Sequence, residues 1–233
     1  MNNEASIMQE RAINKEDFKM TSLIKLKQTA FFGIKRGFDI VVSLVGCIVL
    51  LPLMIIVKIS NMISGDYNPI FYKQKRIGKN GKLIYIYKFR SMVPNADEVL
   101  QELLEKSPER KKEWELNQKL ENDPRITKMG NILRKTSLDE IPQMINVLKG
   151  DMSLIGPRPL IEGELDSHNG NHQIYENVRP GITGWWACNG RSATTYEERL
   201  KLEYYYVQNM SLKLDIKCII KTVLAVIKKD GAK

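Results

Sequence analysis

Two adjacent carboxylates, Asp139 and Glu140, are the side chains best suited to chemistry in this sequence. With Ser137 they fit a helix capping box, in which Ser137 caps the helix and Glu140 reaches back to it. Pro142 favours a second interpretation, in which Asp139 is the cap and the proline lies in the first turn. Both interpretations place the acids at a helix N-terminus, where free N–H groups attract phosphate and favour an ionised carboxylate. Taken alone, such a pair is more often a cap than a catalytic dyad.

Basic residues on both sides of the dyad strengthen the catalytic interpretation. Arg134 precedes it, and Arg158 follows it between two prolines. Proline fixes its own φ and restricts the residue before it, so Arg158 is held on an extended backbone suited to bidentate phosphate binding. Farther on, the segments 179–185 and 189–191 combine glycine, tryptophan and arginine. They could hold a base and a diphosphate.

This combination suits attack of a carboxylate on phosphorus. The nucleophile must approach a polyanion, which becomes possible when arginines and Mg²⁺ neutralise the phosphates. A second carboxylate can bind the metal or handle a proton. Because neighbouring residues on a helix point about 100° apart, we expect Asp139 and Glu140 to take different roles.

An apolar run, Ile40–Val57, identifies the element that would bring this site to a membrane. It carries no charged residue and lies near the short limit of about 20 residues for a spanning helix. Pro52 should kink or break the helix, and both flanks are basic, which favours the cytoplasmic side for both ends. A re-entrant hairpin, with Ser43 or protein contacts satisfying the freed backbone, is therefore preferred to a span. A buried core helix is the third possibility.

The remaining elements are expected to build a mostly helical α/β domain. Pro69–Met92 predicts a β-hairpin that turns at Asn80-Gly81. Helices are expected over Glu98–Leu120 and Met129–Lys135. Two basic amphipathic helices, Phe18–Phe32 and Ser211–Lys229, could lie on a membrane surface or pack on the domain.

Charge and composition limit the possible partners. The net charge of +9 and the pI of about 9.3 favour anionic partners, namely nucleic acid, phosphorylated substrates or an anionic membrane. The apolar run argues against a nucleic-acid binder, and we expect no nucleic-acid partner. Three well-separated cysteines give no disulfide framework or thiolate zinc motif. His168 and His172 have helical spacing but a loop-like composition, so a solvated loop is favoured over a metal pair.

The sequence resembles the bacterial sugar transferases of the monotopic phosphoglycosyl transferase superfamily. The match runs in order from about Lys35 to Thr222, and it is carried by Lys35-Arg36-x-x-Asp39, Pro69-x-Phe71-x-x-Gln74-x-Arg76-x-Gly78, Lys88-Phe-Arg-Ser-Met92, Asp123-Pro-Arg-Ile-Thr127, Leu133-Arg134, Ser137–Gln143, Asn146–Pro159, Pro180–Trp185 and Asn189-Gly-Arg191. A scaffold that keeps the fold without catalysis is the weaker alternative, because the dyad and arginines are present.

The resemblance implies a catalytic domain at the cytoplasmic face of the bacterial cell membrane. Its parts would be a surface segment (1–33), a re-entrant helix broken at Pro52 (34–63, with Ser43 and Leu51 in the membrane), a catalytic domain (64–210) and an amphipathic helix (211–233). The protein would be a monomer or homodimer. The chain would be the small form of the family, without the multi-span N-terminal domain of the larger members.

The resemblance also implies the reaction. A sugar 1-phosphate would pass from a UDP-sugar to undecaprenyl phosphate with release of UMP and with Mg²⁺, as the first membrane step of capsule, exopolysaccharide or O-antigen synthesis. Asp139 would form a covalent phosphosugar intermediate, and Glu140 would assist as metal ligand or in proton handling. Substrate contacts are expected from Lys88, Arg90, Arg125, Arg134, Arg158, Arg179, Gly181, Thr183, Asn189 and Arg191.

The chain departs from the family pattern near the expected nucleotide contacts. The family usually has Gly-Trp-Ala-Gln-Val-Asn-Gly-Arg where this chain has Gly184-Trp-Trp-Ala-Cys-Asn-Gly-Arg191. Ala187 therefore stands where glutamine is usual, and Ser192 where asparagine is common. These departures concern nucleotide or sugar contacts and leave the dyad intact.

Overall fold

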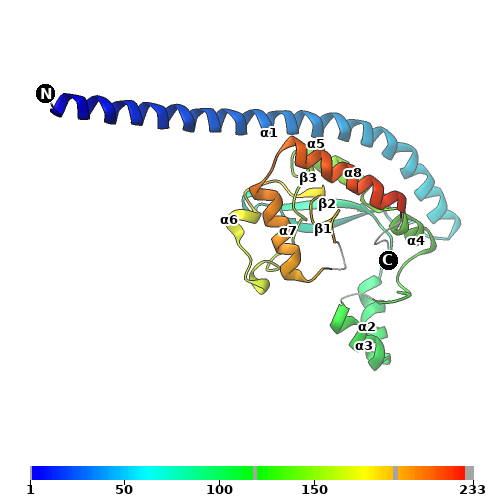
Figure 1. Ribbon diagram of the computed structural model, residues 1–233. Coiled ribbons are helices and arrows are strands. Elements are labelled where there is room, and N and C mark those ends of the chain that lie inside the picture. The colour runs from blue at the N-terminus through cyan, green and yellow to red at the C-terminus, as the bar shows by residue number, and fades with distance from the viewer. Residues whose placement is uncertain (1, 118–119, 191–193, 229–233) are drawn as a thin grey trace.

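A long helix crosses one side of a mixed α/β body that contains two small sheets (Figure 1). The computed structural model describes residues 2–117, 120–190 and 194–228, and it describes the side chains of 28–115, 120–190 and 194–225. The expected α/β class, mostly helical with a hairpin, is confirmed.

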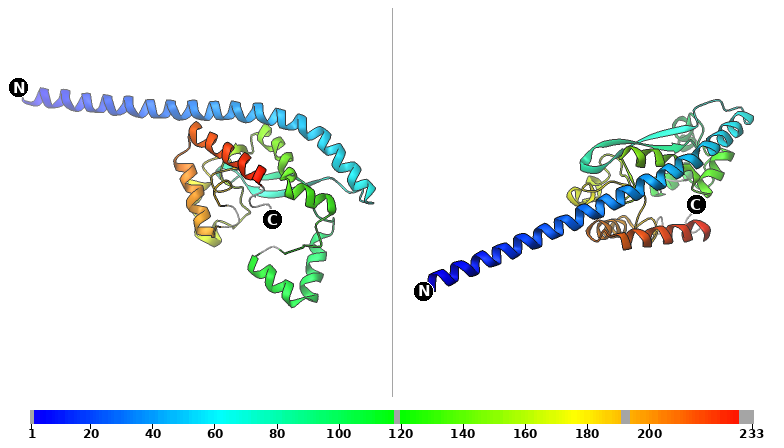
Figure 2. Two further views of the ribbon diagram at one scale, coloured as in Figure 1. Left: turned by 45° about the vertical axis from the view of Figure 1, so that its right-hand side comes forward. Right: turned by 90° about the horizontal axis from the view of Figure 1, so that it is seen from above.

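The long helix, α1 (Asn2–Ile63), runs without interruption through both predicted N-terminal segments and contains Pro52. Of the kink or break expected at Pro52, the structure shows no break: the helix continues and bends over its C-terminal part, while its N-terminal part extends beyond the body (Figures 1 and 2). Proline removes one backbone hydrogen bond, which a helix can absorb as a bend. Leu50 and Val57, on either side of Pro52, are buried against the body and hold the helix there.

The predicted hairpin is confirmed. β1 (Phe71–Ile77) pairs antiparallel with β2 (Leu83–Phe89), and η1 (Lys79–Gly81) connects them. Asn80 and Gly81 have φ of 58° and 71°, the left-handed values that this turn requires. Alternation along β2 buries Ile84 and Ile86 and exposes Tyr85, as a sheet with one covered face demands.

The segment expected as one helix over Glu98–Leu120 is two helices, α2 (Ala96–Lys106) and α3 (Pro108–Asn117). Pro108 causes the break, because the residue before a proline is disfavoured in helical conformation and Ser107 is extended, with ψ of 103°. The two helices project from the body (Figure 1). The predicted short basic helix is confirmed as α4 (Lys128–Lys135), which Thr127 caps by accepting from the Gly130 N–H.

After α4 the chain continues through the short helices η2 (Leu138–Gln143) and α5 (Met144–Lys149) to β3 (Ser153–Ile155), which pairs in parallel with β4 (Gly181–Thr183). Between these strands lie η3 (Asp166–His168) and α6 (His172–Tyr175), and α7 (Tyr196–Gln208) and α8 (Leu212–Lys228) follow them. The largest core cluster joins β2, α5, β3, α7 and α8; its buried members are Ile84, Ile86, Val147, Met152, Leu154, Ile155, Tyr206, Leu214 and Cys218.

Three charged residues of α1 fasten this helix to the body. Lys35 pairs with Asp215 of α8, with 2.7 Å between Nζ and Oδ2. Arg36 donates to the carbonyls of Val147 and Leu148 at the C-terminal end of α5. The buried Asp39 accepts from the Ser153 hydroxyl and the Leu154 N–H. Lys35 and Arg36, which belong to the basic flank that precedes the apolar run, are thus bonded within the protein.

Candidate active site

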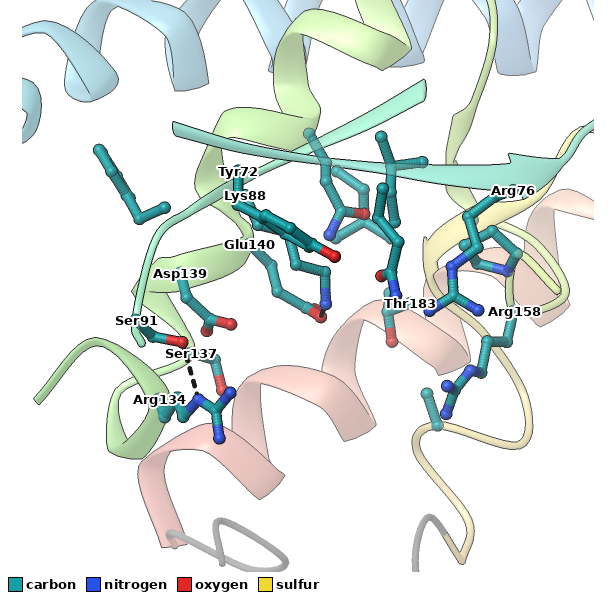
Figure 3. Close-up of a pocket in the computed structure, with 18 of the residues that line it drawn as sticks. Tyr72, Arg76, Lys88, Ser91, Arg134, Ser137, Asp139, Glu140, Arg158 and Thr183 are labelled. Carbon is teal, nitrogen blue, oxygen red and sulfur yellow. Dashed lines mark hydrogen bonds and ion pairs between the residues drawn. The ribbon is translucent and has the colours of Figure 1, made fainter. Parts of the chain in front are cut away.

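A cavity of about 960 Å³ opens between the hairpin, η2 and α7. Figure 3 shows Ser91, Arg134 and Asp139 on one side of it, and Arg76, Arg158 and Thr183 on the other. Lys88 and Glu140 lie between these two groups (Figure 3). A cavity of this size can hold a nucleotide-sized ligand.

Asp139 and Glu140 lie in the first turn of η2, so their expected placement at a helix N-terminus is confirmed. The capping box is wrong. Ser137 has φ of 55° and makes no side-chain cap, because the chain turns sharply after α4 to begin η2. Pro142 is accommodated inside this 3-10 helix.

The two carboxylates have different surroundings. Glu140 forms an ion pair with Lys88, with 2.7 Å between Oε1 and Nζ. Asp139 makes no ion pair with another described side chain. Burial, followed by the charge of Glu140, raises the pKa of Asp139, while the charges of Lys88 and Arg134 lower it. Asp139 is thus a poorly solvated carboxylate that faces the cavity, as a nucleophile requires.

Arg134 is oriented by a buried hydroxyl. Its Nε donates to Ser91 Oγ at 2.9 Å (Figure 3), which is the guanidinium's one hydrogen bond to a described residue. α4 can approach Ser91 so closely because Gly130 lacks a side chain, whose Cβ would lie 1.9 Å from the Ser91 carbonyl oxygen. The remaining N–H groups of Arg134 are available to an anion beside Asp139.

The opposite end of the cavity combines Arg158, which the sequence singled out, with Arg199 and Glu203, which it did not. The backbone N–H of Arg158 donates to Glu203 at 3.0 Å, and its carbonyl accepts from the Tyr175 hydroxyl at 2.9 Å. The guanidinium groups of Arg158 and Arg199 lie over the Trp186 ring. Arg199 and Glu203 belong to α7, whose sequence resembles a solvated surface helix, so only their packing identifies them.

Several predicted contact residues line the cavity. Besides the dyad, Arg134 and Arg158, they are Lys88, Arg90, Gly181 and Thr183. Arg90 is nevertheless occupied, because its guanidinium bonds to Asp66, Pro69 and Met92. Gly181 serves close packing, since its Cβ would lie 2.1 Å from the Gly156 nitrogen.

Three predicted contact residues are directed elsewhere. Arg125 makes a paired interaction with Asp123 and covers the Trp114 ring. Arg179 bonds to the Gly150 carbonyl on the α1 side of the body. Asn189 donates to the Trp185 carbonyl and accepts from Lys221. In each case the polar group is bonded to a neighbouring residue that does not line the cavity. Arg191 lies outside the described residues, as does Ser192, whereas Ala187 lines the cavity.

Comparison with known proteins places these residues in a family. The family model described as bacterial sugar transferase matches residues 30–229. An undecaprenyl-phosphate galactose phosphotransferase of Salmonella typhimurium is 47% identical over 199 residues, which cover 85% of this chain and 41% of that protein. The exopolysaccharide production protein ExoY of Sinorhizobium fredii is 41% identical over 198 residues, covering 85% of this chain and 87% of that protein.

A more distant relative differs in the sugar that its name gives. It is the UDP-N-acetylgalactosamine-undecaprenyl-phosphate N-acetylgalactosaminephosphotransferase of Aeromonas hydrophila, 34% identical over 206 residues, with 86% of this chain and 45% of that protein covered. This chain therefore spans less than half the length of some curated relatives and most of the length of others. The match over most of the chain and the shared motifs around the cavity lead to one conclusion: the chain belongs to the bacterial sugar transferase family.

Proposed function

We propose that this protein transfers a sugar 1-phosphate from a UDP-sugar to undecaprenyl phosphate and releases UMP. The observation that carries the proposal is the half-buried carboxylate of Asp139, which makes no ion pair with another described side chain and shares a cavity with the Lys88–Glu140 pair and with Arg134 and Arg158. The printed names of the relatives, which include undecaprenyl-phosphate phosphotransferases and exopolysaccharide proteins, support the same reaction as a membrane step of capsule or exopolysaccharide synthesis.

In the first step a carboxylate oxygen of Asp139 attacks the β-phosphorus of the UDP-sugar. The new bond joins phosphorus to Asp139, and the bond from that phosphorus to the bridging oxygen breaks, so UMP leaves with the bridging oxygen. Arg134, held by Ser91 beside Asp139, stabilises the charge on the phosphoryl oxygens. Desolvation of Asp139 increases its reactivity as long as it remains ionised.

In the second step the phosphate oxygen of undecaprenyl phosphate attacks the phosphosugar group on Asp139. The bond between phosphorus and Asp139 breaks, which restores the carboxylate and forms the lipid diphosphate sugar. Glu140 forms an ion pair with Lys88 and so holds the lysine ammonium group in the site. Its carboxylate can also share a proton with the incoming phosphate.

The donor set fits Mg²⁺. Asp139 and Glu140 are hard oxygen ligands at adjacent positions, and the charge of Glu140 contributes to the raised pKa of Asp139, a repulsion that a cation relieves. The described residues contain no group of three or more potential ligand side chains, so the chain would supply these two carboxylates and the substrate phosphates would supply further oxygens. When bound, Mg²⁺ would neutralise the charge of the diphosphate.

The same proposal places the protein on the cytoplasmic face of the cell membrane. The stretch Gln28–Ile63 of α1 is long and apolar enough to cross a membrane. It exposes an apolar stripe at helical spacing, formed by Val41, Val45, Ile48, Leu51, Ile55 and Ile59. On α8, Ile216, Ile220, Val223 and Leu224 are also exposed. These surfaces would rest in lipid, and a re-entrant path for α1 predicts that tags on both sides of it are cytoplasmic.

The catalytic proposal is tested with purified protein in nanodiscs, undecaprenyl phosphate, Mg²⁺ and a panel of UDP-sugars, with UMP release as readout. One productive UDP-sugar would identify the donor, and Asp139→Asn should reduce UMP release at least about 10³-fold. Asp151→Asn is the matched control, because Asp151 lies outside the cavity and should retain activity. Undiminished UMP release by Asp139→Asn would exclude Asp139 as the nucleophile.

A further inference from the structure

Three arginines from distant parts of the chain meet at the end of the cavity that lies away from Asp139. Arg76 comes from β1, Arg158 from the loop after β3, and Arg199 from α7. Figure 3 shows Arg76 and Arg158 directed toward the same part of the cavity, across from Arg134 and Asp139. We call these three residues the arginine cluster.

Two members of the cluster are buried with unused donors. Arg76 is 8% exposed and Arg199 is 6% exposed. Among the described residues, Nε of Arg76 and both Nε and Nη2 of Arg199 have no hydrogen-bond partner. A buried N–H without a partner destabilises a protein, more so when it carries charge, so such groups normally meet a ligand or water.

The charges around the cluster do not balance. Glu164 bonds Arg199 at 3.0 Å and lies 3.9 Å from Arg76, so one carboxylate serves two guanidinium groups. Glu203, 1% exposed, accepts the Arg158 backbone N–H through Oε1, and its Oε2 has no partner in the described part of the chain. Burial raises the pKa of Glu203 to about 7, so this carboxylate is partly protonated near neutral pH. Three positive charges therefore face fewer than two negative ones.

Aromatic rings fix the orientation of the guanidinium groups. Arg158 and Arg199 lie over Trp186 with 5.7 and 4.8 Å from Cζ to the ring centroid, and Arg199 also lies 4.9 Å from the Tyr196 centroid. Stacking covers the faces of a guanidinium and leaves its N–H edge free for bidentate binding of an oxyanion. The excess positive charge and the free N–H edges both suit the same class of ligand, a phosphate group.

We infer that the arginine cluster is a second phosphate subsite, in which Arg76 and Arg199 bind a substrate phosphate together with Arg158. Arg134 serves the phosphate that reacts at Asp139, and the cluster holds another phosphate at the opposite end of the cavity. The identity of that phosphate as part of a nucleotide or of a polyprenyl phosphate rests on the proposed function. The existence of the subsite does not depend on turnover.

Binding measurements on the full chain in nanodiscs test the subsite directly. The probes are UMP and farnesyl phosphate, a short polyprenyl phosphate, and the variants are Arg76→Lys and Arg199→Lys. Lysine keeps the charge but loses the guanidinium fork, so affinity for at least one probe should fall about tenfold or more, the effect of one charge-assisted hydrogen bond. Arg125→Lys is the matched control, a buried arginine outside the cavity that should retain wild-type affinity.

A second measurement does not disturb the arginines. Glu203 faces Arg158, Arg199 and Tyr175, and its ionisation above pH 7 adds negative charge beside the subsite. The phosphate of each probe also loses its second proton at about pH 6, so the effect of Glu203 is measured as the difference between the wild type and Glu203→Gln. Between pH 6.5 and 8 the affinity of the wild type should fall relative to that of Glu203→Gln, because the glutamine does not ionise. The unliganded melting temperature of each variant shows that it is folded.

The outcomes separate the possibilities. A loss confined to UMP assigns the subsite to the nucleotide, a loss confined to farnesyl phosphate assigns it to the acceptor, and a loss of both indicates a shared subsite. Wild-type affinity for both probes in Arg76→Lys and Arg199→Lys would overturn the inference and make the cluster a structural brace. An equal loss in Arg125→Lys would overturn it too. Failure of every UDP-sugar to release UMP would refute the proposed function and leave the binding result standing.

Discussion

Replacing Lys35 by methionine tests whether the buried ion pair with Asp215 fastens α1 to the catalytic body. The two side chains are 10% and 8% exposed, and 2.7 Å separates Nζ from Oδ2. The Tyr206 hydroxyl also contacts Asp215, with 2.7 Å to Oδ1. Lys35→Met retains the apolar stem and leaves the carboxylate buried without its cation, which typically destabilises a protein by about 3–5 kcal/mol.

Lys35→Met should therefore lower the free energy of unfolding by about 3–5 kcal/mol. The double variant with Asp215→Asn should recover much of the loss, because the amide still accepts from Tyr206.

Denaturant unfolding in detergent, followed by tryptophan fluorescence, measures these differences. Lys75→Met is the matched control, since Lys75 pairs with Glu162 at 3.2 Å but the two side chains are 50% and 71% exposed. An exposed pair contributes no more than about 1 kcal/mol. A loss for Lys35→Met that equals that of Lys75→Met would refute the reasoning.

Three further predictions concern the site and its surroundings. Lys88→Met removes a charge that lowers the pKa of Asp139, so the acidic limb of UMP release against pH should move to higher pH; an unchanged profile would exclude this coupling. Gly130→Ala should reduce the free energy of unfolding by about 1–3 kcal/mol and raise KM for the donor. The alanine Cβ would meet the Ser91 carbonyl and shift the Ser91 hydroxyl that orients Arg134. Calorimetry measures the first effect and steady-state kinetics the second. Glu176 and Asp166 raise the pKa of His172 above its ordinary value near 6.5. The stability that these contacts contribute is therefore fully present below pH 6.5 and is lost as the pH rises through the raised pKa. Melting curves of His172→Gln should lack this part of the pH dependence.

Local sequence signals predicted the elements whose hydrogen bonds close within a few residues. The hairpin follows from alternating side chains and the Asn80-Gly81 turn, and α4 and α8 lie within a residue of their expected ends. The dyad was found at a helix N-terminus for the same reason. The errors arise where local signals conflict: Pro108 begins a new helix inside the segment expected as one, and Ser137 turns the chain instead of capping η2 with its side chain. At Pro52 the sequence allowed a kink or a break, and the helix bends without breaking.

The sequence by itself determined the dyad, the proline-flanked Arg158, the apolar helix and the family resemblance, since each depends on residues adjacent in the chain. Tertiary structure alone decided which distant side chains share the cavity. It brought Arg76 and Arg199 to Arg158, and it turned the predicted contact residues Arg125, Arg179 and Asn189 toward local partners. The physical reason is that a charged group bonds to whatever partner packing brings within about 3 Å, and helix and strand packing sets those partners across long sequence separations.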